Sequence, residues 1–218
     1  MDQSLLLIIN REWTNPFLDY VMAIASSAPL WVPLLVVAGI ALFFFGGFRG
    51  RSLLITAALC LLVVDGIAVN FGKRLVNRPR PSDVLTEVRE PDLARLPKNK
   101  PKFLALFSPL EITYSAPGVI LPQGRSFPSG HAANNFAFAT ILALFYRRWG
   151  WLCFFPALIV GYSRIYVGAH WPSDILISCL LGSALSLLVI TALQSLWKHL
   201  GTRYLPTLYA AHPDWIPA

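Results

Sequence analysis

The amino-acid sequence predicts an all-α fold: a polytopic bundle of transmembrane helices with about five spans, preceded by interfacial N-terminal helices. Composition is the first reason, because 56% of the 218 residues are hydrophobic, only 13% are charged, and the mean hydropathy is +0.57. Soluble domains carry more charge than this. The second reason is the recurrence of apolar runs of about 20 residues, the length that crosses a hydrocarbon core of about 30 Å.

The N-terminal segment, residues 1–28, is expected to lie at the membrane interface as two short helices. It begins apolar, but Asn10-Arg11-Glu12 and Asn15-Pro16 interrupt it and make a straight crossing costly. The first two spans are then predicted over residues 29–48 and 52–72. A tight turn at Arg49-Gly50-Arg51 would join them.

The remaining segments complete a single domain over residues 1–218. Residues 73–128 are polar and rich in proline, so we expect an extracytoplasmic loop, with an apolar patch at 112–121 that dips into the interface. Residues 198–218 form a short aromatic segment, expected to be a cytoplasmic tail. Three further spans are predicted between them, over residues 130–146, 150–168 and 174–197.

Charge predicts the orientation and the kind of partner. With five spans, the short basic segments fall on one side, which the positive-inside rule makes cytoplasmic; they contain Arg49, Arg51, Arg147, Arg148, Lys198, His199 and Arg203. The long loop and the segment around His170 then face outward. The formal net charge of +7 is not gathered on an amphipathic or low-complexity tail, so the expected partner is an anionic lipid and no nucleic acid.

The segment before the last span places polar residues between apolar runs. Pro172 suits the first turn of a helix, which predicts a helix start there, with His170 just before it and Asp174 in the first turn. Asp174 would bond one ring nitrogen of His170 and leave the other to attack an electrophile or hold a proton. Arg164, earlier in the chain, is a planar cation suited to phosphate. Taken alone, the pair fits a simple helix cap at the membrane surface equally well.

Two further clusters lie at the ends of predicted spans on the same side. The first runs from Lys73 to Pro81 and is rich in cations, although snorkelling at a membrane boundary also explains such a cluster. The second is Ser129-Gly130-His131, where Ser129 is a good N-cap and the first N–H groups of the helix form an anion site. A capped helix with an interfacial histidine is the plainer interpretation.

Together the three clusters supply cations, a helix N-terminus, two histidines and a carboxylate, the groups that phosphoryl transfer requires. A metal centre would need more ligands than His131, His170 and Asp174 offer, so we expect no metal and no cofactor. The cysteines lie singly in apolar runs without metal-ligand spacing. The rival from another class is a non-catalytic lipid-binding or transport protein, whose charges would lie deep in several spans.

The order and spacing of these clusters resemble the three signature blocks of the type 2 phosphatidic acid phosphatase superfamily. Lys73 is followed after six residues by Arg80-Pro81; Pro128-Ser129-Gly130-His131 comes next. Ser163-Arg164 is then followed after five residues by His170, and after three more by Asp174. The resemblance covers residues from about 29 to 197 and implies a metal-independent membrane phosphatase that works through a phosphohistidine.

The resemblance also implies a role for each signature residue. His170 is the expected nucleophile, Asp174 orients it, and His131 is the acid for the leaving group. The phosphoryl group would be bound by Lys73, Arg80, Ser129, Gly130 and Arg164. The short chain resembles bacterial undecaprenyl-diphosphate phosphatases, so undecaprenyl diphosphate is the expected substrate and a bacterial inner membrane, with the site facing the periplasm or cell exterior, the expected location. Phosphatidylglycerophosphate, lipid A 1-phosphate and a lipid phosphotransferase reaction remain alternatives.

Some polar residues within the spans have no assigned role. Asn135 lies one helical turn from His131 and would steady it or touch the headgroup. A hydrogen bond between helices explains it equally well, as it does Asp65, Asn70 and Asn134.

Overall fold

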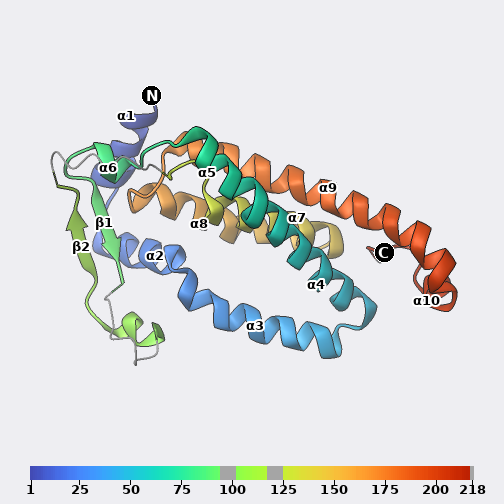
Figure 1. The fold of residues 1–218 in the computed structure, drawn as a ribbon. Coiled ribbons are helices and arrows are strands. Elements are labelled where there is room, and N and C mark those ends of the chain that lie inside the picture. Colours follow the sequence, from blue (N-terminus) through green and yellow to red (C-terminus); the bar gives the residue numbers. More distant parts are fainter. Residues whose placement is uncertain (94–101, 117–124, 217–218) are drawn as a thin grey trace.

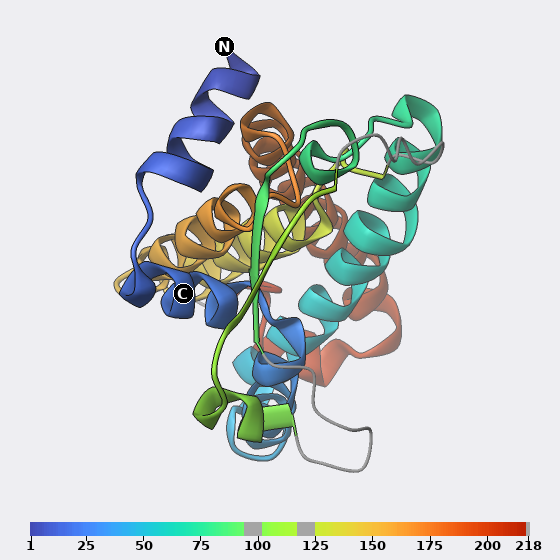
Figure 2. The same cartoon turned by 90° about the vertical axis from the view of Figure 1, so that its left-hand side faces the viewer.

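The computed structural model describes residues 1–93, 102–116 and 125–216, and the helical bundle predicted from the sequence is confirmed (Figure 1). The helices run roughly along one long axis. One end of the bundle carries α1, α2, α6 and the two strands, and the other carries the α3–α4 turn and α10 (Figure 1). Figure 2 looks onto the first of these ends, where the strands cross in front of the helices.

The N-terminal segment forms the expected short helices, but they pack into the protein. They are α1 (Asp2–Leu7), continued by the π-helical turn η1 (Ile8–Glu12), and α2 (Pro16–Ser26). Asn15 caps α2, accepting a hydrogen bond from the Leu18 N–H. Buried Asn10 donates to the carbonyl oxygens of Arg89 and Tyr166, at 2.8 and 2.7 Å. The segment therefore covers α8 and the loop.

The first hairpin of spans turns earlier than predicted. Helix α3 (Ala28–Phe45) ends at Gly46, and α4 (Gly47–Leu61) begins at once. The predicted turn at Arg49-Gly50-Arg51 is wrong, because those residues lie in the first turns of α4. Gly47 takes a φ of +56°, which favours glycine, and a Cβ at Gly50 would come within 2.4 Å of the Leu42 carbonyl oxygen. Glycine thus allows both the turn and the close approach of the two helices.

The second span is longer than predicted. Helix α4 continues through the π-helical η2 (Leu62–Val69) into α5 (Asn70–Val76), so the helix ends past the expected residue 72. Asn77 stops it in the left-handed conformation, with φ of +46°. Lys73 therefore lies inside the last turn of a helix, which gives its side chain a fixed direction.

The long loop contains short regular elements that the sequence did not predict. They are α6 (Pro81–Val84), β1 (Arg89–Asp92), the 3₁₀ helix η3 (Lys102–Phe107) and β2 (Glu111–Tyr114). The strands pair antiparallel, with Arg89 opposite Tyr114. The expected apolar patch at 112–121 begins in β2, whose residues are exposed; its part from 117 onward lies outside the described residues.

The C-terminal half follows the predicted spans closely. Its helices are α7 (Gly130–Phe145), η4 (Gly150–Cys153) with α8 (Phe154–Tyr166), and α9 (Pro172–Tyr204). Helix α9 runs beyond the predicted end at 197, and α10 (Pro206–Ala211) folds back beside it (Figure 1). The expected tail is therefore partly packed: buried Trp215 donates from its ring N–H to the Thr56 hydroxyl at 2.9 Å.

Three helices in the described part of the chain are long and apolar enough to cross a bilayer by length and composition: α3, the helix that begins at Gly47, and α9. Helix α3 has no buried residue and is apolar all round, as expected of a lipid-facing span. Helix α7 has 16 residues, and η4 with α8 has 4 and 13, so these are shorter than the rest. The expected count of about five spans includes them.

Helices α7 and α9 form the centre of the bundle and approach very closely. A Cβ at Gly182 would lie 2.0 Å from the Ala133 carbonyl oxygen, so only glycine allows this crossing. On the same face of α9, Ser178 and Ser186 are fully buried. The first turns of both helices, which carry signature residues, are thereby held side by side.

Candidate active site

The three signature blocks meet at one end of the bundle because their backbones are bonded to one another. The Ser126 N–H donates to the Arg78 carbonyl at 2.9 Å, and the Trp171 ring N–H donates to the Pro79 carbonyl at 2.8 Å. The Ser129 N–H donates to the Ser178 hydroxyl on α9 at 2.8 Å. Segments far apart in sequence thus form one rigid surface.

His170 lies in the turn between α8 and α9, just before the helix start at Pro172, as predicted. It is 4% exposed, and its Nδ1 lies 2.5 Å from the Ser126 carbonyl oxygen. A carbonyl oxygen only accepts, so Nδ1 carries the proton and Nε2 keeps a lone pair. The backbone N–H of His170 is held by the Arg164 carbonyl at 3.1 Å. The ring is therefore fixed in the tautomer that a nucleophile needs.

The predicted contact from Asp174 to the His170 ring is wrong; a serine stands between them. The Asp174 carboxylate is fully buried in the first turn of α9 and accepts from the Ser126 hydroxyl at 2.5 Å and from the Trp171 N–H at 3.2 Å. Ser126 thus binds Asp174 through its side chain and His170 through its carbonyl. His170 precedes the helix, so the four-residue spacing does not place its ring above Asp174.

Arg78 neutralises the buried carboxylate and extends the network to the N-terminus. Its guanidinium donates to Asp174 Oδ1 at 2.6 Å and to Asp2 Oδ2 at 2.7 Å. Asp2 also accepts from the N–H and the hydroxyl of Ser173. Burial opposes the charge of Asp2, but the hydrogen bonds from Ser173 and Arg78 outweigh it and hold the pKa of Asp2 below its usual range.

Two of the predicted cations, Arg164 and Arg80, lie within electrostatic range of His170. Burial first, and then the positive charges of Arg164 and Arg80, hold the pKa of His170 well below its ordinary value of 6.5. The imidazole is therefore neutral at physiological pH. Arg164 donates from one guanidinium nitrogen to the Ser26 hydroxyl, whereas its buried Nε has no partner in the described part of the chain. An unpaired buried donor of this kind is costly unless an anion meets it.

The start of α7 brings the second histidine to the same place. Ser129 caps the helix as predicted, accepting from the Ala132 N–H. His131 lies within electrostatic range of Arg164, Lys73 and Arg80. A Cβ on Gly130 would come within 2.9 Å of an Asp65 carboxylate oxygen, so the glycine makes room for this carboxylate beside the cations. All of the predicted site residues thus share one region.

The other polar residues of the spans mostly bond within their own helices. Asn135 donates to the His131 carbonyl at 2.9 Å, and Asn70 donates to the Asp65 carbonyl at 2.9 Å. The Asn134 side-chain oxygen is buried without a partner among the described residues. Within residues 1–93, 102–116 and 125–216, no three His, Cys, Asp or Glu side chains gather as a metal site. Metal independence remains a prediction.

Three residues of this network were not predicted from the sequence: Ser126, Arg78 and Asp2. Arg78 lies inside the recognised cation cluster but between its signature positions, and Ser126 lies three residues before the N-cap Ser129. Their polar character close to the signature blocks was the available signal. Nothing in the sequence connects Asp2 to the site, because only the packing of α1 brings it there.

A bundle of membrane helices, with a buried neutral histidine among cations at one end, defines a class of membrane enzyme that acts on phosphate esters. Residues 52–198 match the family described as the PAP2 superfamily. The chain therefore belongs to the PAP2 superfamily, and it is a membrane phosphatase.

Known relatives agree with this assignment. The chain is 28% identical over 186 residues to a lipid A 4'-phosphatase of Bacteroides thetaiotaomicron, covering 84% of this chain and 72% of that protein. It is 43% identical over 70 residues to an undecaprenyl-diphosphatase of Sulfolobus acidocaldarius, covering 32% of this chain and 34% of that protein. The crystal structure of Aquifex aeolicus LpxE superposes with a TM-score of 0.58 at 25% identity, covering 87% of this chain and 94% of that one.

Proposed function

We propose that this phosphatase hydrolyses a membrane lipid phosphate without a metal ion, with His170 as the nucleophile. The observation that carries the proposal is the fixed tautomer of His170. Nδ1–H is held by the Ser126 carbonyl, behind which Asp174 and Arg78 are paired, and Nε2 keeps its lone pair. A buried neutral imidazole needs no prior deprotonation to attack.

In the first step Nε2 of His170 attacks phosphorus, forming a P–N bond as the P–O bond to the leaving group breaks. His131, in its protonated form, would give a proton to the departing oxygen. Water would then attack phosphorus while His131 accepts its proton, and the P–N bond would break, which releases phosphate and restores both histidines. Lys73, Arg80 and Arg164 would bind the phosphoryl oxygens together with Ser129 and Gly130. The Ser129 N–H already bonds Ser178, so the backbone donors we assign are the next N–H groups of α7.

Two lipid substrates are supported by the relatives. The similarity to the lipid A 4'-phosphatase of Bacteroides thetaiotaomicron extends over most of this chain, and another lipid A 4'-phosphatase, from Porphyromonas gingivalis, is 26% identical over 98% of it. The undecaprenyl-diphosphatase similarity covers about a third. Because the lipid A 4'-phosphatase similarity extends over much more of the chain, we place a phosphorylated glycolipid of the lipid A type first. Undecaprenyl diphosphate, the substrate expected from the sequence, comes second.

Phosphate release by the purified protein tests the proposal. In EDTA, we expect release from lipid A and from undecaprenyl diphosphate, and inhibition by orthovanadate, which imitates the trigonal-bipyramidal phosphoryl group. Activity lost in EDTA and restored by magnesium would contradict the metal-free mechanism. Phosphate found on a lipid acceptor instead of in solution would make the protein a phosphotransferase that uses the same site.

We also propose that the protein lies in a bacterial inner membrane with this site outward. In a background without Cys60, Cys153 and Cys179, we expect Thr113→Cys in exposed β2 to react with a membrane-impermeant maleimide after the outer membrane is permeabilised. Arg147→Cys, at the other end, should stay protected. Labelling of Arg147→Cys alone would show that the protein has the opposite orientation in the membrane, and it would exclude an outer-leaflet substrate.

A further inference from the structure

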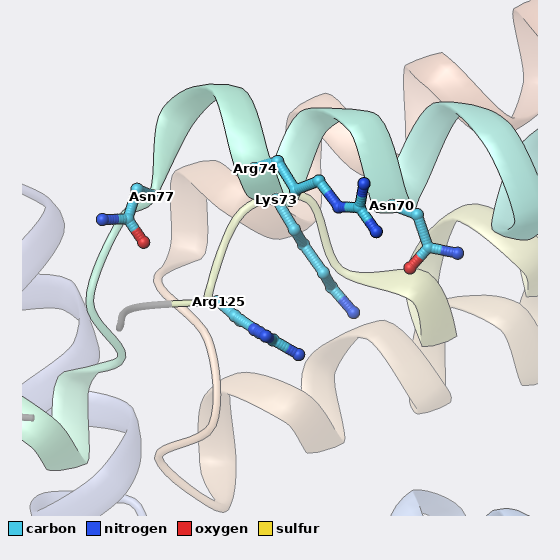
Figure 3. Close-up of a pocket in the computed structure, with 5 residues that line it drawn as sticks. All are labelled: Asn70, Lys73, Arg74, Asn77 and Arg125. Carbon is cyan, nitrogen blue, oxygen red and sulfur yellow. The ribbon is translucent and has the colours of Figure 1, made fainter. Parts of the chain in front are cut away.

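A polar cavity of about 390 Å³ shares Lys73 with the proposed phosphoryl site. Among the described residues, its lining consists of cations and amides: Asn70, Lys73, Arg74, Asn77 and Arg125. In Figure 3, Lys73 from α5 and Arg125 from the segment before α7 reach into the same space, and the Arg74 head group lies near Asn70. Lys73 therefore borders both the cavity and the site, while the two arginines belong to the cavity.

The charges of this cavity are not balanced by the protein. Within the described ranges no carboxylate pairs with Arg74 or Arg125, whereas Arg78 pairs with two carboxylates. Arg125 is near enough to Lys73 for their like charges to repel. Asp65 attracts Lys73, but one carboxylate cannot offset three cations. An anion in the cavity would relieve this repulsion.

Arginines that anchor this protein at the opposite end are arranged differently. Four of them lie over aromatic rings at 5.2 to 5.8 Å, the geometry of a cation–π contact: Arg49, Arg51, Arg148 and Arg203. In the described part of the chain neither Arg74 nor Arg125 has such a ring. Both arginines are exposed, so a ligand in the cavity can reach their guanidinium groups, and a planar fork suits phosphate.

We propose that this cavity, the second-anion pocket, binds a further phosphate group on the same lipid whose phosphate is attacked by His170. Lys73 lies between the two phosphates, and Arg74 and Arg125 hold the one that is not cleaved. The inference rests on the proposed function, and it makes the substrate a lipid with two phosphates. These are the two of a diphosphate or those of a bisphosphorylated glycolipid.

The test compares matched lipids with one and two phosphates. Two pairs are used: farnesyl diphosphate with farnesyl monophosphate, and lipid A bisphosphate with its monophosphate. For each pair, kcat/KM for the lipid with two phosphates is divided by kcat/KM for the lipid with one, in wild type, Arg74→Met and Arg125→Met. We expect each variant to lower the ratio about tenfold for the pair that uses the pocket, because a charge-assisted hydrogen bond contributes about 1.5 kcal/mol or more. The responding pair shows which source supplies the second phosphate. Arg148→Met, an exposed cation at the other end, should leave both ratios unchanged.

Equal losses on both lipids of each pair, or unchanged ratios, would overturn the pocket while leaving the phosphatase proposal intact. If no lipid is hydrolysed, equilibrium binding tests the second-anion pocket separately from the proposed phosphatase function. His170→Ala and the wild-type protein in detergent are each titrated with the four lipids. We expect tighter binding of the lipids with two phosphates in at least one pair, lost in Arg74→Met. Equal affinities throughout would refute the pocket independently of turnover.

Discussion

Arginine side chains lie at both ends of the helix bundle, but their partners differ. At the end with α10, Arg49 lies over the Tyr146 ring and Arg148 over the Trp149 ring, at 5.8 and 5.2 Å. At the site end, Arg78 lies over the Trp171 ring at 5.1 Å but also pairs with two carboxylates, and the buried Nε of Arg164 has no partner among the described residues. Aromatic contacts complete the first group of cations, whereas the second group is arranged around an anion.

At the end with α10, aromatic side chains form a cluster near the arginines. Trp197, Trp215 and Phe48 pack together there, with Phe48 stacked on His212 at 4.3 Å. A cluster of this kind fits a membrane interface and requires no ligand. Charge at a helix end is therefore weak evidence for a site. Ring contacts occur at both ends, so carboxylate partners and buried donors without a partner among the described residues are what distinguish the site end.

The largest effect is expected from replacing the nucleophile at the centre of the site. His170→Ala should lower phosphate release by roughly 10⁴-fold or more, because a nucleophile cannot be bypassed. Acid-quenched protein should carry no phosphohistidine. His131→Ala should still form phosphoenzyme on a substrate with a good leaving group. Equal labelling of the two variants would reverse our assignment of the histidines.

A smaller effect is expected for a matched pair of arginines, one at each end. Arg78→Ala leaves the fully buried Asp174 carboxylate with fewer donors, so we expect kcat to fall about 100-fold and thermal stability in detergent to drop, since such a hydrogen bond contributes about 1.5–3 kcal/mol. Arg148→Ala removes an exposed cation and should change neither quantity. If both variants behaved alike, the difference between the ends would have no functional meaning.

The smallest effect concerns two buried serines. Ser126→Ala removes the hydroxyl that reaches Asp174 but keeps the carbonyl that holds His170, so we expect kcat to fall about tenfold with KM unchanged. Ser52→Ala, equally buried at the aromatic end, should have no effect on kcat. A fall in KM or an unchanged kcat in Ser126→Ala would remove Ser126 from the positioning network.

The helix starts were predictable because their cause is local. Ser129 caps α7 and Pro172 opens α9, and these choices depend only on neighbouring residues. The hairpin turn was misplaced because Arg49 and Arg51 mark the level of the headgroups, while the glycine pair Gly46-Gly47 makes the turn. Polarity and chain reversal are separate properties, and here they lie a few residues apart.

The members of the site were predictable, but the contacts between them were not. The spacing of His170 and Asp174 indicated a direct bond, yet spacing predicts contact only when both residues lie in the same helix. Ser126 stands between them because the loop before α7 bonds to the Arg78 carbonyl. Contacts of this kind depend on how distant loops fold together, which local sequence patterns do not specify.

The contact of Gly182 with the Ala133 carbonyl has a consequence for how the enzyme meets its lipid. Because no side chain separates the two helices at this crossing, sliding α9 along α7 would bring their backbones into steric clash. We therefore expect His131 and the first turn of α9 to keep their separation when a lipid binds. The adaptation required by headgroups of different size would then fall on the lipid. A rigid phosphate-binding site of this kind would accept lipids that have only the phosphate group in common.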